Sequence, residues 1–224
     1  MSKRLDLIAS LVPNGTGMID VGTDHGYLPV LLAQAGYEGA LFASDIHPGP
    51  LAAARKTASA AELENRICFL LCDGLALCPP KKIDTIVIAG MGGDMIVKIL
   101  DEAEWCMDKR YQLVLQPATK AEVLRYWLVN NEFCISAERL MEEGGILYQI
   151  LTARFGGKTE LNDAELFAGK RSLTGDCLLY DKHVRMIKRR FQNAVAGMKK
   201  AEMTPRLDLY LEILNQLERM EDPA

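Results

Sequence analysis

The chain has 224 residues, 49% hydrophobic and 25% charged, a composition typical of a globular protein with enough apolar side chains for a full core. It contains no run of about 18 apolar residues and begins without the apolar stretch of a secretory signal, so we expect a cytoplasmic protein that does not span a membrane. The formal charge of −4 argues against a general attraction to nucleic acid.

Short apolar stretches alternate with helical patterns over the first 130 residues. The pattern predicts a helix over residues 3–12, then strands over 18–21, 40–44, 67–71, 83–89 and 112–115. Between and after these strands it predicts helices over 27–35, 50–61, 94–103 and 120–129. Strands that alternate with helices favour a parallel sheet covered on both faces.

The pattern changes after residue 131. Two extended runs, 133–140 and 146–151, flank Gly144 and Gly145 and predict a β-hairpin. Five parallel strands closed by this hairpin give a seven-stranded, Rossmann-like α/β sheet. The hairpin distinguishes that sheet from the six parallel strands of nucleotide-binding dehydrogenases.

The last third of the sequence is helical. We expect one domain over 1–157 and a small helical domain over 158–224, because Gly156 and Gly157 mark the exit from the sheet. Steps of three and four residues predict a coiled-coil seam at Tyr180, Val184, Ile187, Phe191, Ala194 and Met198. Thr204 and Pro205 then supply the N-cap and first-turn proline of a second helix. Its apolar face holds Leu207, Tyr210, Leu214 and Leu217, which predicts a helical hairpin.

Positive charge is concentrated at the start of this helical region. Residues 158–206 hold 11 Lys or Arg against 6 Asp or Glu. Lys188, Arg189 and Arg190 are our candidates for contacts with RNA phosphates. The alternative is a solvated basic helix face with no ligand.

A turn rich in Gly and Asp follows the first strand. Its candidate ligand-binding residues are Asp20, Gly22, Thr23, Asp24, Gly26 and Tyr27. Open parallel sheets bind ligands beyond the carboxyl ends of their strands, and glycines let the backbone approach a ligand closely. Because Asp24 lies inside the turn and repels a pyrophosphate, the turn favours the cationic amino acid end of S-adenosylmethionine over a dinucleotide. The alternative is a plain Gly-rich turn.

Acidic residues also end the next two strands. Asp45, followed by Ile46, is placed to accept hydrogen bonds from ribose hydroxyls. Asp73 can accept from an adenine amino group while Gly74 leaves room for the ring. Each residue alone is more typical of a turn or helix cap. Three acidic strand ends together favour one cofactor pocket.

The fourth strand runs into Gly90, Met91, Gly92 and Gly93. We expect Gly90 and Met91 to contact the cofactor, with Met91 as an apolar wall, and Gly92 and Gly93 to form an open floor for the substrate. The Asn/Asp-Pro-Pro-Tyr/Phe motif of many amino-methylating enzymes is absent. A helix entry capped by Asp94 is the alternative.

Four side chains belong to the same expected rim. Gln116 is a candidate for bonding to a base, and Tyr27 for stacking on one, although core packing is an equal alternative for Tyr27. Asp24, His25 and Tyr27 are the candidate catalytic residues, with His25 as a base or hydrogen-bond donor or simply a satisfied turn residue.

A metal site is not expected. The six cysteines form no Cys-x-x-Cys pair and the three histidines are scattered, so we predict reduced, structural thiols.

Three motifs together resemble a known family. They are Asp20-Val21-Gly22-Thr23-Asp24-His25-Gly26-Tyr27-Leu28-Pro29, Ile88-Ala89-Gly90-Met91-Gly92-Gly93 and Leu113-Val114-Leu115-Gln116-Pro117. The chain resembles the bacterial tRNA (adenine-N1)-methyltransferases that modify adenine 22 of tRNA. The resemblance implies a class I methyltransferase domain joined to a small C-terminal coiled-coil domain, S-adenosylmethionine as cofactor, tRNA as partner and N1-methyladenosine as product. We expect a monomer or weak homodimer.

Other functions remain open at this point. The sheet motifs alone also fit a methyltransferase that acts on another RNA, a protein or a small molecule. A nicotinamide-dependent oxidoreductase is disfavoured by Asp24 and the hairpin, and a non-catalytic RNA-binding protein would bind the cofactor without turnover.

Overall fold

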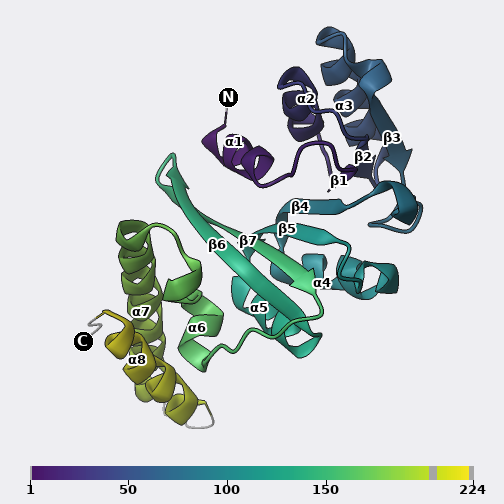
Figure 1. Cartoon of the computed structure of the whole chain (residues 1–224). Helices are drawn as coiled ribbons and strands as arrows, with labels where there is room; N and C mark the ends of the chain where they lie inside the picture. The colour runs from purple at the N-terminus through teal and green to yellow at the C-terminus, as the bar shows by residue number, and fades with distance from the viewer. Residues whose placement is uncertain (1, 202–205, 222–224) are drawn as a thin grey trace.

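The structure, a computed structural model, describes residues 2–201 and 206–221 and is built on one seven-stranded sheet (Figure 1). Its strands lie in the order β3 (Ile67–Leu71), β2 (Leu41–Asp45), β1 (Met18–Val21), β4 (Thr85–Gly92), β5 (Gln112–Thr119), β7 (Ile146–Phe155) and β6 (Phe133–Glu143). The first five pair in parallel, and β7 pairs antiparallel with both β5 and β6. The predicted fold is therefore confirmed, with the strand order reversing between β1 and β4.

Helices cover both faces of the sheet, because successive strand side chains point to opposite faces and both sets are apolar. Met18 of β1 packs with α1 (Lys3–Ser10), α2 (Tyr27–Gln34) and α3 (Pro48–Ala60). Its neighbour Ile19 packs on the other face with α4 (Gly93–Asp101) and α5 (Ala121–Asn130). Short 3-10 helices lie at Glu64–Arg66, Pro80–Lys82, Glu104–Cys106 and Arg171–Leu173.

The chain beyond the sheet forms α6 (Asp163–Ala168), α7 (Cys177–Lys200) and α8 (Leu207–Glu221). α7 and α8 run antiparallel, since Phe191 contacts Tyr210 while Arg171, just before α7, reaches the Met220 carbonyl. The predicted helical hairpin is therefore confirmed (Figure 1). The expected cap at Thr204 and Pro205 lies outside the described residues.

The seam of this hairpin differs slightly from the predicted one. Tyr180, Val184 and Phe191 are buried as expected, but Val195 is buried where the pattern placed Ala194. On α8 the buried residues are Ile213 and Leu217. α7 also packs against α6, where the centroids of the Phe167 and Phe191 rings lie 4.9 Å apart. The sequence pattern had not indicated α6.

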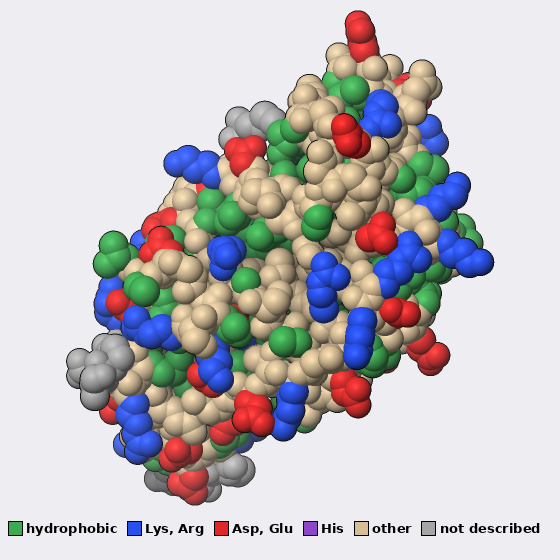
Figure 2. All heavy atoms as spheres, viewed as in Figure 1, with side chains coloured by type: hydrophobic (Ala, Val, Ile, Leu, Met, Phe, Trp, Pro, Cys, Tyr) green, Lys and Arg blue, Asp and Glu red, His purple; other side chains and the backbone are tan. Residues whose placement is uncertain are grey.

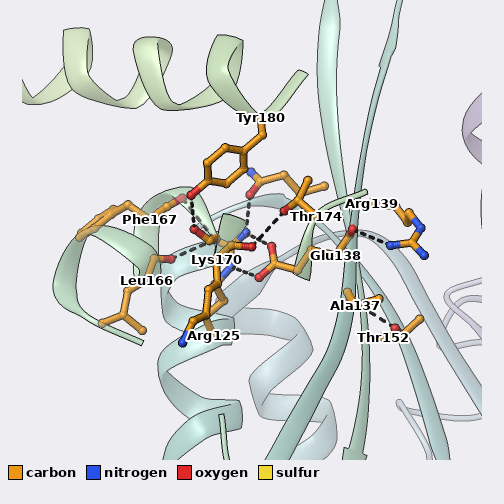
Figure 3. Close-up of polar contacts among 12 residues, drawn as sticks. Arg125, Ala137, Glu138, Arg139, Thr152, Leu166, Phe167, Lys170, Thr174 and Tyr180 are labelled. Atoms are coloured by element: carbon orange, nitrogen blue, oxygen red, sulfur yellow. Dashed lines mark hydrogen bonds and ion pairs between the residues drawn. The ribbon is translucent and has the colours of Figure 1, made fainter. Parts of the chain in front are cut away.

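A buried polar cluster joins the C-terminal helices to the sheet (Figure 3). The fully buried Arg125 of α5 donates to the buried Glu138 of β6, with the shorter contact at 2.6 Å. The same guanidinium donates to the carbonyls of Leu166 and Phe167 at the end of α6, and to Gln149 Oε1. Three elements of the chain are therefore tied to one side chain.

Candidate active site

Two cavities lie along the carboxyl ends of the parallel strands, where the predicted residues were expected to meet. The first, about 460 Å³, lies at the carboxyl ends of β1, β4 and β5 and is lined by residues that include Asp20, Gly22, Thr23, Asp24, His25, Tyr27, Gly90, Met91 and Gln116. The second, about 440 Å³, lies at the ends of β1, β2 and β3 and is lined by Gly22, Asp45, Ile46, Asp73, Gly74 and Met91. Both volumes fall in the range of small-ligand pockets, roughly 300–1,000 Å³.

The turn after β1 is held in an uncommon backbone conformation. Gly22, Asp24 and Gly26 have φ angles of 71°, 51° and 69°, in the left-handed region that favours glycine. A Cβ at Gly26 would lie 2.9 Å from Ala54 Cβ, so glycine is also required there for close packing against α3. These constraints hold the turn against the rim of both cavities.

Two buried carboxylates anchor the turn. Asp20 Oδ2 accepts from Thr23 Oγ1 at 2.7 Å, and Asp45 Oδ2 accepts from the backbone N–H of Asp24 at 3.3 Å. The other Asp45 oxygen accepts from the backbone N–H of His47 at 2.9 Å. Each carboxylate oxygen can accept a further bond, so both acids remain available to a ligand.

The pKa of Asp20 is raised to about 6, mainly because the carboxyl is buried. The Thr23 hydrogen bond and the charge of Arg4 act in the opposite direction, and Asp45 adds to the rise. A buried carboxyl beside a cavity, poised to ionise near neutral pH, is suited to a cationic ligand group.

Met91 separates the two cavities. β4 extends to Gly92, beyond the predicted end at residue 89, because Met91 and Gly92 pair with Pro117 and Thr119 of β5. The register shifts around Gly90, which has a φ of 82°, and this bulge redirects the chain. A Cβ on Gly22 would lie 2.1 Å from Met91 Cε, so the methionine side chain rests directly on the β1 turn.

Gly92 and Gly93 line neither cavity. A Cβ at Gly93 would lie 2.1 Å from the Lys120 carbonyl oxygen, so this glycine allows α4 to pack closely against the start of α5. Asp94 pairs with Lys120 at 2.6 Å. The structure thus places Gly90 and Met91 at the cavities and the next two glycines in a helix junction, and the substrate-binding role expected for Gly92 and Gly93 stays a prediction.

The candidate catalytic side chains lie together on the rim of the first cavity. The Tyr27 ring is 54% exposed and stacks on His25, with the ring centroids 5.4 Å apart. His25 Nε2 lies 3.7 Å from Asp24 Oδ1. An exposed aromatic pair beside a cavity offers a flat surface on which a base can stack.

Two residues that the sequence pattern did not indicate, Arg4 and Tyr148, also line the first cavity. Arg4 NH1 donates to Gln116 Oε1 at 2.6 Å, and its guanidinium lies over the Tyr148 ring, 5.5 Å from the centroid. Gln116 is 1% exposed and its Nε2 has no partner among the described residues. Arg4 belongs to a short amphipathic helix, and nothing in its local sequence marks it as a cavity residue.

A third cavity, about 370 Å³, lies between the catalytic edge and α7. Its lining includes Ala118 and Lys120 on one side and Ile187 and Arg190 on the other. Ala118 also lines the first cavity, so the two adjoin. Of the predicted basic residues, Arg190 lines this cavity, whereas Lys188 lies 3.8 Å from Glu218 of α8.

Figure 2 shows that Lys and Arg are interspersed with Asp and Glu over the face it presents. RNA contact on that face would therefore depend on particular side chains rather than on a broad positive surface. In the described ranges, no helix has the length and apolarity needed to cross a membrane. No group of three or more His, Cys, Asp or Glu in those ranges is arranged to hold a metal ion, and all six cysteines are free.

The strand order and the acid-lined cavities define a Rossmann-like methyltransferase domain, and a family model described as "Methyltransferase domain" matches residues 1–151. The tRNA (adenine(22)-N(1))-methyltransferase of Bacillus subtilis is 33% identical over 190 residues, 84% of this chain and 79% of the relative. The chain belongs to the family of tRNA (adenine(22)-N(1))-methyltransferases.

Solved structures extend the likeness over the whole chain. The crystal structure of the Bacillus subtilis m1A22 tRNA methyltransferase TrmK has a TM-score of 0.87 and 27% identity and covers 99% of both chains. A Streptococcus pneumoniae protein crystallised with S-adenosyl-L-methionine has a TM-score of 0.80 and 30% identity, covering 99% of this chain and 100% of that one. The C-terminal helices thus belong to the shared structure.

Proposed function

We propose that this protein transfers the methyl group of S-adenosylmethionine to N1 of adenine 22 in tRNA. The observation that carries the proposal is the 33% identity to the Bacillus subtilis enzyme of that name over 84% of the chain. We propose residues 1–157 as the catalytic domain and residues 158–224 as a tRNA-contacting domain, in a cytoplasmic monomer or weak homodimer.

The residues along the strand ends fit the cofactor. Asp45 and Asp73, with Ile46 and Gly74, line the cavity suited to the adenosine end, because carboxylates accept from ribose hydroxyls and an amino group. Asp20, at the other cavity, suits the ammonium of the amino acid end. Met91 and Gly22 lie where the two meet. When bound, S-adenosylmethionine supplies a methyl group activated by its positively charged sulfur.

Methyl transfer to N1 requires alignment of the base with the methyl donor more than it requires a general base. N1 of adenine carries its own lone pair, so no proton has to leave before attack, and most of the acceleration should come from proximity. The product ring is cationic, and we assign Asp24 to stabilise the charge that develops on it. Tyr27 and His25 orient the base by stacking and hydrogen bonding.

Incubation with labelled S-adenosylmethionine and bulk tRNA, followed by nucleoside analysis, tests the reaction. We expect label in N1-methyladenosine at position 22, and no label in any tRNA nucleoside would refute the proposal. Label in another nucleoside would point to a different RNA target instead.

The role of Asp24 is tested by measuring turnover at saturating cofactor and tRNA, so that binding defects do not obscure the chemical step. We expect Asp24→Ala to lose turnover by about a hundredfold, a typical cost of removing one group that stabilises developing charge. Asp24→Asn keeps the size and removes the charge, and it should be similarly slow. Full turnover in both variants would show that the assignment is wrong.

We further propose that tRNA phosphates lie along α7. Lys188, Arg189 and Arg190 are the proposed contacts, and the cavity between Arg190 and Lys120 leads from α7 to the catalytic edge. Replacing all three by Ala should weaken tRNA binding and lower the slope of log affinity against log salt by roughly 0.7–0.9 per lost phosphate contact. Unchanged binding would favour a solvated helix face.

A further inference from the structure

The first cavity contains a buried hydrogen-bond donor that none of the described residues satisfies. Gln116 lies near the end of β5, lines the cavity and is 1% exposed. Its Nε2 has no partner among the described residues. Because buried amide N–H groups almost always have an acceptor, this one points to an acceptor on the ligand that fills the cavity.

Arg4 decides which end of the amide faces that ligand. Its NH1 group donates to Gln116 Oε1 at 2.6 Å, a charge-assisted hydrogen bond. Flipping the amide would set an NH2 donor against a guanidinium that has only donors, so the flipped orientation is disfavoured. Arg4 is itself fixed by the Tyr148 ring below it, and its NH1 lies 3.6 Å from where a Gly90 Cβ would stand.

The position of Gln116 separates it from the cofactor residues. In the sheet, β4 lies between β1 and β5, and Gln116 pairs in register with Ala89 of β4. The acids assigned to the cofactor, Asp20, Asp45 and Asp73, lie at the carboxyl ends of β1, β2 and β3, on the other side of β4. The unpartnered donor therefore lies on the β5 side of the cavity, away from those acids.

We propose that Arg4 and Gln116 form a positioning pair, in which Arg4 holds the Gln116 amide so that Nε2 donates to a ring nitrogen, N3 or N7, of the target adenine. This inference rests on the proposed function. N1 must face the methyl donor, and the N6 amino group is itself a donor, so N3 and N7 are the ring acceptors left. The bond fixes the base in the plane that presents N1.

Target tRNAs that carry adenosine, 7-deazaadenosine or 3-deazaadenosine at position 22 test this bond atom by atom. We expect the wild-type enzyme to lose about tenfold in kcat/KM on one of the two deaza substrates. Gln116→Ala should have a kcat/KM about tenfold below that of the wild-type enzyme on the adenosine tRNA. Its kcat/KM should not fall further when the adenosine is replaced by that same deaza base. Comparing the two enzymes cancels the intrinsic reactivity of each base.

Arg4 is tested by the same pattern. Arg4→Ala should reduce the loss of kcat/KM caused by the deaza base, because the Gln116 amide is then free to rotate. Arg4→Lys keeps a charged donor and should retain most of that loss. Assays at pH 8 lie well above the pKa of Asp20 in the wild-type protein, which is about 6. Gln112→Ala is the matched control, because Gln112 also lies on β5 and bonds the segment after α1, at the Leu11 carbonyl, outside the cavity.

The outcomes separate this inference from the proposed function. Failure of the wild-type enzyme to label N1-methyladenosine in normal tRNA would refute the function. Labelling with no loss on either deaza substrate, or with a full further loss in Gln116→Ala, would overturn only the positioning pair. A tenfold weaker affinity of Gln116→Ala for S-adenosylmethionine, measured by calorimetry without tRNA, would overturn it as well by assigning the amide to the cofactor. If Arg4→Ala does not fold, the Gln116 and Arg4→Lys results still decide.

Discussion

Replacing Arg125 by Leu should strongly destabilise the junction between the sheet and the C-terminal helices. The guanidinium is fully buried and makes five hydrogen bonds, two to Glu138, two to carbonyls at the end of α6 and one to Gln149 (Figure 3). Without it, the Glu138 carboxylate, itself 1% exposed, stays buried with no counter-ion.

Removing one partner of a buried ion pair typically costs about 3–5 kcal/mol. Since whole proteins are stable by only about 5–15 kcal/mol, we expect a large loss in the free energy of unfolding for Arg125→Leu. Arg125→Leu combined with Glu138→Leu leaves no buried charge and should recover part of that loss.

Urea unfolding followed by circular dichroism and by tryptophan fluorescence measures the effect. Lys182→Ala is the control, because Lys182 of α7 pairs with Glu142 of β6 across the same junction but at the surface. Exposed pairs contribute about 0–1 kcal/mol. A loss for Arg125→Leu no larger than the loss for Lys182→Ala would refute the reasoning.

Two further predictions concern the β1 turn. The pKa of Asp20 is raised to about 6, so its attraction for a ligand ammonium is present above that pH and is lost as the pH falls through it. Calorimetry should therefore show that S-adenosylmethionine binds about tenfold more weakly at pH 5 than at pH 8. An equally steep pH dependence of binding in Asp20→Asn would contradict this assignment. Gly26→Ala should lower the free energy of unfolding by about 1–3 kcal/mol more than Gly144→Ala. Both glycines have a positive φ, but a Cβ at Gly26 would meet Ala54, whereas nothing lies within 4 Å of a Cβ at Gly144. Equal losses in urea titrations would mean that backbone strain alone sets the cost.

The central strands were predictable because each is a short apolar run bounded by turn residues. β1 and β3 have the predicted bounds, and the Asp residues at the strand ends line the two cavities. The end of β4 was not predictable, since Gly90 to Gly92 has the composition of a turn and becomes strand only through pairing with β5.

Features that depend on distant contacts were missed. Arg4 and Gln116 are 112 residues apart, and only the folded chain brings them together. The burial of Val195 in place of Ala194 was missed as well. For α6 a local signal did exist: the capping box at Asn162 and Glu165, in which each side chain bonds the other residue's backbone N–H.

α5 connects both ends of the proposed enzyme. The Lys120 carbonyl, just before α5, lies against Gly93 beside the catalytic edge, and Arg125, five residues on, holds the end of α6. At 1.5 Å per residue this spacing is about 7.5 Å of rigid helix. Within the proposed function, this link keeps the catalytic edge and the C-terminal helices at a fixed separation, so the distance between the target base and the tRNA backbone would be part of what the enzyme recognises.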